Sequence, residues 1–219
     1  MTLNFPGMAP GLPALLQAGT GPRALAVLGH GAGAGMTHRH MQSIAAALDQ
    51  VGIATLRFNF PFMEKGGGRV DPIPICVETF ARALEAGQAH LPGLPCVVGG
   101  HSFGGRMSSH FSLLVQPDIR GLVYFSFPLH PAGKPSVARA AHLGDIELPQ
   151  LFVSGDRDKL ADLSLLRETV RSLKNARLHE IATADHSLAI RKRQRKTDED
   201  VYSELARVVD DWLRATLAH

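Results

Sequence analysis

The sequence predicts an α/β protein built on a mostly parallel sheet with helices on both faces. Short apolar runs alternate along the chain with longer segments whose apolar residues recur at helical spacing. The short runs are apolar throughout, which is typical of parallel strands buried on both faces. At 219 residues and 45% hydrophobic, the chain is long enough for one sizeable core. We therefore expect a single domain over residues 1–219.

The expected elements follow one another in order. Residues 1–20 hold several prolines and glycines and no clear period, so we expect an extended arm with at most one helical turn near residues 13–18. We expect six strands, at residues 23–28, 53–58, 95–98, 121–125, 150–154 and 177–181. The expected helices cover residues 37–50, 75–89, 106–116, 160–173 and 199–217.

A glycine-rich turn at the middle of the chain carries the clearest chemical signal. Gly100-His101-Ser102-Phe103-Gly104 follows an expected strand and precedes an expected helix. This G-x-S-x-G pattern in a strand, turn and helix context is typical of a nucleophile elbow, in which only small residues fit two positions either side of the serine. The alternative is a glycine-rich turn with an incidental serine. We interpret Ser102 as a nucleophile.

A serine nucleophile requires a histidine base and a carboxylate that orients it. His186 follows the expected strand 177–181 and is the candidate base. Asp156 and Asp158 both follow the strand 150–154. We favour Asp158 as the acid and expect Asp156 to bond to the local backbone of the turn. Asp185 is a poorer candidate, because a side chain adjacent to His186 in sequence rarely points at its ring.

The turn after the first strand, His30-Gly31-Ala32-Gly33, has the glycines that let backbone approach a substrate closely. We expect the backbone N–H groups of Ala32 and Phe103 to form an oxyanion hole. The alternative is a plain flexible connector. Five further residues are possible pocket residues: His30, Gly33, His101, His130 and Arg57.

The possible pocket residues also have ordinary structural roles. His130 follows the strand 121–125 and would either line the pocket or pack within its loop. Arg57 and Arg106 would either meet an anionic substrate or brace loops. We favour the structural role for all three.

Composition argues against several other classes of protein. The net charge of +3 is concentrated in the run 191–196, and aromatic residues make up only 6%, so we expect no nucleic-acid partner. Cys76 and Cys96 lack the spacing of a zinc or redox site, and His38 and His40 have no carboxylate nearby, so we expect no metal and no cofactor. No signal peptide or membrane span is evident, which predicts a soluble cytoplasmic protein.

Five stretches resemble an α/β-hydrolase-like family related to dienelactone hydrolases. This family includes a subunit of the eukaryotic non-specific-lethal chromatin complex and a testis-expressed protein. The stretches are His30-Gly31-Ala32-Gly33-Ala34-Gly35, Leu56-Arg57-Phe58-Asn59-Phe60-Pro61-Phe62, Gly100-His101-Ser102-Phe103-Gly104-Gly105-Arg106, Phe127-Pro128-Leu129-His130-Pro131-Ala132-Gly133-Lys134-Pro135 and Ala184-Asp185-His186-Ser187-Leu188. They span roughly residues 23–217, and the proline-lysine loop is the most specific of them.

The resemblance implies the α/β-hydrolase fold and places Ser102, Asp158 and His186 at the positions of the catalytic triad. It also highlights two departures. His101 stands where many bacterial relatives have lysine, and the antiparallel strands that open a full hydrolase sheet are expected to be absent or much shortened. A minimal lid is expected, because only a short loop, 128–148, occupies the usual place of a lid.

These observations predict a serine hydrolase that acts on carboxylic esters or related acyl bonds of small substrates. Two alternatives remain: an interaction module with a hydrolase fold but no physiological turnover, and an acyltransferase that uses the same residues. The sequence leaves the oligomeric state, the acyl group and the leaving group open.

Overall fold

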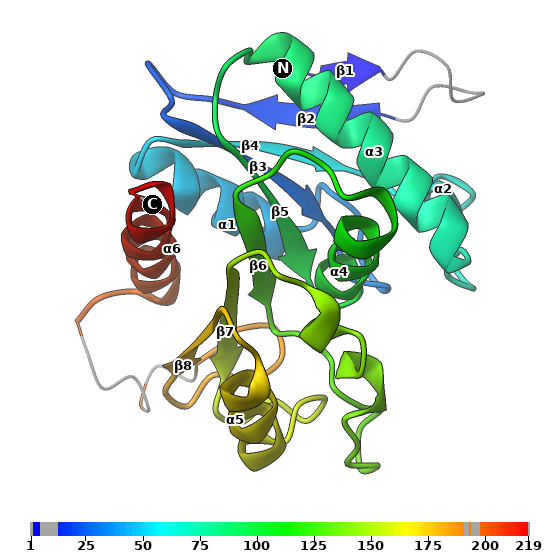
Figure 1. The fold of residues 1–219 in the computed structure, drawn as a ribbon, viewed down its shortest axis with the longest axis vertical. Helices are drawn as coiled ribbons and strands as arrows, with labels where there is room; N and C mark the ends of the chain where they lie inside the picture. The colour runs from blue at the N-terminus through cyan, green and yellow to red at the C-terminus, as the bar shows by residue number, and fades with distance from the viewer. Residues whose placement is uncertain (1, 5–12, 191–192, 194–197, 219) are drawn as a thin grey trace.

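The computed structural model describes residues 2–4, 13–190, 193 and 198–218. At its centre lies one sheet with the strand order β1-β2-β4-β3-β5-β6-β7-β8 (Figure 1). Strands β3 to β8 are parallel, and β1 and β2 are antiparallel to their neighbours. The expected α/β class, with a mostly parallel sheet, is therefore confirmed.

The six expected strands are all present in the sheet. They are β3 (Ala24–Gly29), β4 (Ile53–Phe58), β5 (Cys96–His101), β6 (Gly121–Phe125), β7 (Gln150–Gly155) and β8 (Ala176–Ile181). Every residue of β3, β4, β6 and β7 is buried, because helices cover both faces of the sheet. Strand β8 is an edge strand and is only partly buried.

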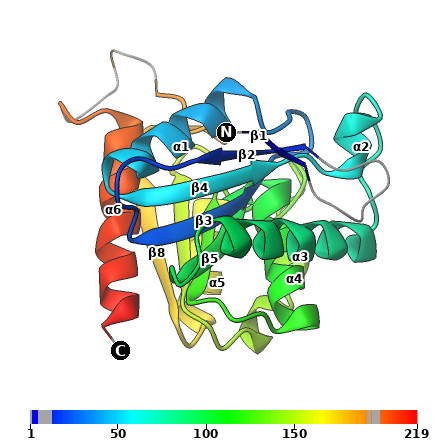
Figure 2. The ribbon, with the colours of Figure 1, turned by 90° about the horizontal axis from the view of Figure 1, so that it is seen from above.

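Five helices cover the sheet in two layers, which Figure 2 shows from above. Helices α1 (Arg39–Gln50) and α6 (Val201–Leu217) pack on one face through apolar residues such as Ile44 and Val209. Helices α3 (Ile73–His90), α4 (Phe103–Val115) and α5 (Leu163–Ser172) cover the other face through residues such as Phe80 and Phe111. Each layer has its own hydrophobic cluster.

The amino-terminal edge of the sheet holds short antiparallel strands, where we expected such strands to be absent or much shortened. Strands β1 (Thr2–Asn4) and β2 (Pro13–Gln17) add an antiparallel pair beside β4, so the sheet has eight strands over the described residues. The expectation of a helical turn near residues 13–18 was wrong. Pro13 is the first residue of its strand, where proline is tolerated, and in β2 only Ala14 is buried. Met1 and residues 5–12 of the expected arm lie outside the described residues.

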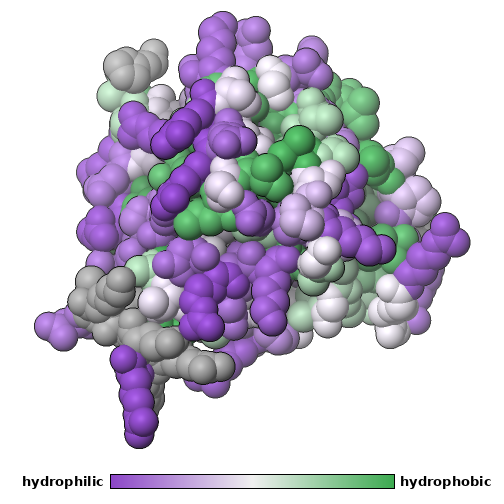
Figure 3. Space-filling view, turned by 90° about the horizontal axis from the view of Figure 1, so that it is seen from below, coloured by the Kyte–Doolittle hydropathy of each residue, from purple (hydrophilic) through white to green (hydrophobic). Residues whose placement is uncertain are grey.

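The connections hold only short helical turns. A four-residue helix, α2 (Pro61–Glu64), follows β4, and two 3-10 turns, Ala138–Ala140 and Leu143–Asp145, lie in the loop 128–148. No long lid is present among the described residues. The face that carries α5 and this loop has mostly hydrophilic side chains around smaller hydrophobic areas (Figure 3).

Two further expectations concern a membrane-spanning helix and the basic run 191–196. Within the described ranges, no helix is long and apolar enough to span a bilayer. The basic run 191–196 lies outside the described residues except for Arg193.

Candidate active site

Ser102 occupies a strained turn between β5 and α4. Its backbone has φ 51° and ψ −112°, a conformation that costs roughly 1 to 3 kcal/mol for a residue other than glycine. A methyl group on either Gly100 or Gly104 would lie 2.1 Å from the carbonyl oxygen of Gly29. Glycine is therefore required at both positions, because β3 passes directly beside the turn. The turn places the Ser102 hydroxyl at the carboxyl end of β5.

Three loops that are distant in sequence converge on this hydroxyl. Nε2 of His186 lies 2.8 Å from Oγ of Ser102, and Nδ1 of His186 lies 2.7 Å from Oδ2 of Asp158. Since the carboxylate accepts, Nδ1–H of His186 donates to Asp158, and Nε2 is free to accept the hydroxyl proton. The side chain of Asp158 is fully buried. This arrangement can increase the nucleophilicity of a serine.

The other two carboxylates have roles in their turns. Oδ1 of Asp156 accepts from the backbone N–H of Thr183 at 2.7 Å, which joins the loops that carry Asp158 and His186. Oδ1 of Asp185 accepts from the backbone of Ser187 and Ala189. Of the three carboxylates weighed from the sequence, only Asp158 bonds to the imidazole of His186.

The glycine-rich turn after β3 lies against Ser102. A methyl group on Gly31 would come within 3.8 Å of Cβ of Ser102. Phe103 is the first residue of α4, so its N–H has no carbonyl partner within the helix. Among the described residues, no acceptor within hydrogen-bond distance takes up the N–H of Ala32. Both expected oxyanion donors thus border Ser102 or the turn packed against it.

A cavity of about 410 Å³ opens over these groups. Its lining includes Ser102 and His186 together with Ala32 and Gly33 of the glycine-rich turn. The apolar side chains of Met41 and Leu160 form other parts of its wall. The size falls within the range of small-molecule sites in proteins.

The family model for the alpha/beta hydrolase domain matches residues 22–214, which is most of the chain. This chain belongs to the α/β-hydrolase family.

Solved structures of other α/β hydrolases share the fold at low sequence identity. An alpha-beta serine hydrolase homologue from Coxiella burnetii is 20% identical, with a TM-score of 0.76 and 96% of each chain covered. A serine hydrolase without a lid, from Xanthomonas campestris, is 19% identical, with a TM-score of 0.73 over 98% of this chain and 94% of that one. A dienelactone hydrolase from Anabaena variabilis is 17% identical, with a TM-score of 0.69 over 98% and 95%. At these identities the likeness shows the fold alone.

In this α/β hydrolase, His101 connects the end of β5 to the loop that carries His186. Its Nε2–H donates to the carbonyl oxygen of His186 at 2.9 Å. Burial lowers the pKa of His101 to about 4, so the ring is neutral at pH 7. A methyl group on Gly31 would lie 3.0 Å from Nδ1 of His101, so the ring also packs against the glycine-rich turn. His101 therefore contacts both the backbone of His186 and the glycine-rich turn after β3.

His40 extends this contact to the carboxyl-terminal helix. Its ring lies edge-on to His101, with centroids 4.4 Å apart, and its Nδ1 lies 3.1 Å from the hydroxyl of Tyr202 in α6. Burial lowers the pKa of His40 to about 3. Our sequence reasoning considered His40 only as a metal ligand and missed Tyr202. The position of His40 at the start of the helix after the glycine-rich turn was the available signal.

Three expected pocket residues do not line the cavity. His30 is fully buried and receives a hydrogen bond on Nε2 from the backbone of Phe60. His130 accepts on Nε2 from the N–H of Asp162, which supports the segment after Asp158. Arg57 donates to the carbonyl of Met36 and so braces a loop. Gly33 and His101 do line the cavity.

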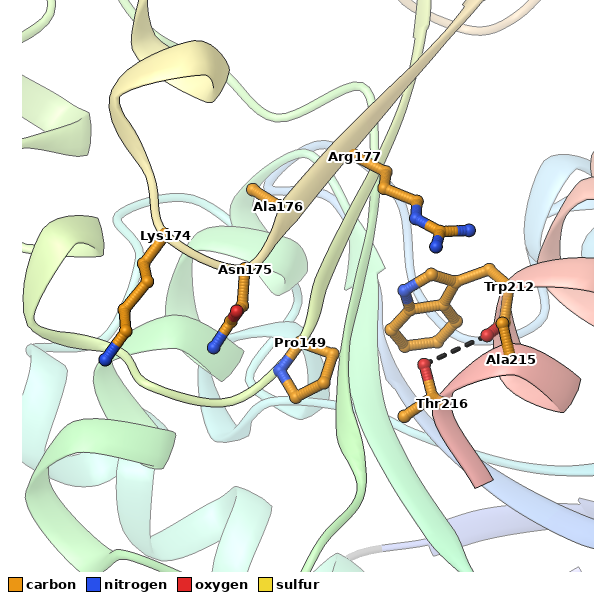
Figure 4. A pocket seen from close by; sticks show the side chains of 8 residues that line it. All are labelled: Pro149, Lys174, Asn175, Ala176, Arg177, Trp212, Ala215 and Thr216. Carbon is orange, nitrogen blue, oxygen red and sulfur yellow. Dashed lines mark hydrogen bonds between the residues drawn. The ribbon is translucent and has the colours of Figure 1, made fainter. Parts of the chain in front are cut away.

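A second cavity of about 430 Å³ lies at the opposite end of the sheet, beside the first residues of β8 (Figure 4). Its wall includes Pro149, Lys174, Arg177 and the indole of Trp212. The hydroxyl of Thr216 donates to the carbonyl of Trp212. The cavity contains neither a serine nor a histidine, so it offers no nucleophile of the kind present beside Ser102.

No group of three or more histidine, cysteine, aspartate or glutamate side chains is arranged to hold a metal ion within the part of the chain that the structure describes.

Proposed function

We propose that this α/β hydrolase is a serine hydrolase that cleaves carboxylic esters, or related acyl bonds, of small uncharged substrates. The observation that carries the proposal is the hydrogen-bonded series Ser102–His186–Asp158, with spacings of 2.8 and 2.7 Å. Serine, base and buried acid in that order are the three groups that acyl transfer through a serine requires.

The proposed reaction begins when Nε2 of His186 takes the proton of Ser102 while Oγ attacks the substrate carbonyl carbon. The backbone N–H groups of Phe103 and Ala32 stabilise the oxyanion, and each such donor contributes roughly 3 to 4 kcal/mol in the transition state. His186 then gives its proton to the leaving alcohol, which leaves an acyl group on Ser102. Water repeats the sequence, so the products are a carboxylic acid and an alcohol.

Asp158 orients the imidazole and stabilises its charged form during both steps. His101 is a positioning residue in this proposal, because its Nε2–H holds the carbonyl of His186 rather than a reacting atom. Its neutral state adds no charge that would oppose the developing imidazolium.

The lining of the cavity supports the substrate class. No lysine, arginine, aspartate or glutamate lies among its twelve lining residues, and His40 and His101 have pKa values of about 3 and about 4. A charged acyl group would lose its hydration there without gaining an ion pair. The volume of about 410 Å³ and the lack of a long lid over the described residues favour short acyl chains.

The experiment is a panel of p-nitrophenyl esters of graded chain length, with wild type and Ser102→Ala compared. We expect turnover of short esters, a fall in kcat/KM as the chain lengthens, and no turnover above background in Ser102→Ala. A long-chain ester as the best substrate would contradict the substrate class. The interaction-module alternative would be favoured if the folded wild-type protein turned over none of the esters and so behaved like Ser102→Ala.

A further inference from the structure

Four basic side chains gather between α4 and the loop 138–145, away from the catalytic cavity. Arg106 and His110 come from α4, and Arg139 and His142 come from the two 3-10 turns of the loop and their boundary. The rings of His110 and His142 stack with centroids 3.9 Å apart and planes 14° apart. Nε2 of His142 also lies 2.7 Å from Oγ of Ser109. We call Arg106, His110, Arg139 and His142 the basic cluster.

The basic cluster contains no carboxylate. None of its four members forms an ion pair with a described residue. Nε of Arg106 and Nε2 of His110 are buried without a hydrogen-bond partner. Arg167 and Arg207, by contrast, each form ion pairs with glutamates. A buried nitrogen without a hydrogen-bond partner destabilises the fold, so this arrangement of side chains is unfavourable.

Mutual repulsion adds to that cost. Burial, then the charge of Arg139, lowers the pKa of Arg106. Burial, then His110 and Arg106, lowers the pKa of His142 to about 4. An anion placed among these groups would offset the repulsion and raise the pKa of both histidines.

We propose that the basic cluster binds the phosphate group of a small molecule. Its donors come from two separate segments, α4 and the facing loop, and so approach a ligand from more than one side. A tetrahedral phosphate presents oxygens in several directions, whereas a carboxylate presents two oxygens in one plane. Arginine pairs well with phosphate through its forked N–H groups. All four side chains are partly exposed, so the ligand enters from solvent.

This site is separate from the proposed catalytic cavity, because none of its four members lines that cavity. Arg106 lies one helical turn after Ser102, and its backbone N–H donates to the carbonyl of Ser102 at 3.1 Å. Ligand binding and ester hydrolysis can therefore be measured independently on the same protein.

The test titrates the full chain with inorganic phosphate by calorimetry, at constant ionic strength set with sodium chloride. We expect saturable binding to the wild type and a rise in Kd of about tenfold or more in Arg106→Gln and in Arg139→Gln. Lys134→Gln is the matched control, because Lys134 is exposed on the same connecting loop and its loss changes the net charge equally. Its Kd should stay within about twofold of the wild type.

A second readout follows the ring protons of His142 by NMR as the pH is varied. Phosphate should raise the pKa of His142 from its value near 4, and sodium acetate at the same ionic strength should not. Absence of saturable binding to the wild type, equal binding by all three variants, or acetate binding as tight as phosphate binding would each overturn the proposal. If Arg106→Gln does not fold, Arg139→Gln alone tests the proposal. Arg139 lies in a partly exposed 3-10 turn, where we expect the substitution to be tolerated.

Discussion

Two serine–histidine pairs in this hydrolase have nearly the same spacing but different surroundings. Ser102 and His186 are 2.8 Å apart, and Ser109 and His142 are 2.7 Å apart. Oγ of Ser109 also donates to the carbonyl of Arg106 at 2.6 Å, so its proton is already committed and it can only accept from His142. Ser109 lies inside α4, where the backbone is regular.

The difference shows that distance alone does not define a catalytic pair. His186 is hydrogen-bonded to the buried carboxylate of Asp158, whereas His142 lies near the basic side chains of His110 and Arg106. Ser102 has a strained backbone and faces a cavity, and Ser109 is fully buried. The first pair can take up a proton and stabilise the resulting charge. The second pair resists a further positive charge, and His142 belongs to the basic cluster for which we propose anion binding.

The largest expected effect comes from exchanging each serine for alanine. Ser102→Ala should lower kcat for a short p-nitrophenyl ester by about 10⁴-fold or more, because the nucleophile is lost. Ser109→Ala should leave kcat within about threefold, since Oγ of Ser109 touches no group of the cavity. Equal losses of kcat in the two variants would show that the two serine–histidine pairs do not differ in their role.

The carboxylate behind the histidine gives the next contrast. Asp158→Asn should lower kcat by about 10⁴-fold, because an amide favours the wrong tautomer of His186. Asp156→Asn keeps an oxygen for the N–H of Thr183 and should lower kcat by about tenfold at most. Steady-state kinetics of the two variants measure both losses, and their melting temperatures serve as the control for folding. A greater loss of kcat in Asp156→Asn than in Asp158→Asn would indicate that Asp156, not Asp158, is the acid.

His101 tests how far support of the base extends. His101→Leu removes the hydrogen bond to the carbonyl of His186, and a shift of the base by about 1 Å would cost about 100-fold in kcat. His101→Gln retains an N–H donor and should recover most of that loss with little change in KM. If leucine and glutamine variants have the same kcat, the hydrogen bond has no positioning role.

The smallest expected effect is on the pH dependence of the free energy of unfolding. His40 and His101 have folded pKa values of about 3 and about 4, below the ordinary value of 6.5, so the unfolded chain binds protons first as the pH falls. Stability is complete above pH 6.5 and decreases from there toward pH 4. Between pH 7.5 and pH 5 each ring should cost about 2 kcal/mol of the free energy of unfolding.

Urea denaturation of the wild type and of His40→Gln at the two pH values measures this cost. The variant should lose about 2 kcal/mol less than the wild type over that interval. An identical loss in both proteins would mean that His40 is not held neutral by the fold.

The sequence predicted the strands that are buried on both faces, because such strands are apolar at every position, as in β3 and β6. It did not predict β1 and β2, since β2 begins with Pro13 and buries only one residue. Its pairing with β4 depends on a partner about 40 residues away, which no local pattern records.

Residues of the candidate site were predictable where a turn motif marks them, as at Ser102, Asp158 and His186. Contacts between distant segments that no motif marks were not predictable. Tyr202 meets His40 across 162 positions, and Ser109 meets His142 across 33. Arg106 was expected to brace loops, yet its side chain has no ion pair among the described residues, and its Nε has no hydrogen-bond partner.

The most direct measurement is fluorophosphonate labelling of the intact protein, followed by mapping of the modified peptide by mass spectrometry. We predict a single adduct on Ser102 in the wild type and in Ser109→Ala, and no adduct in Ser102→Ala. An adduct on Ser109, or labelling that persists without Ser102, would contradict the assignment of the nucleophile.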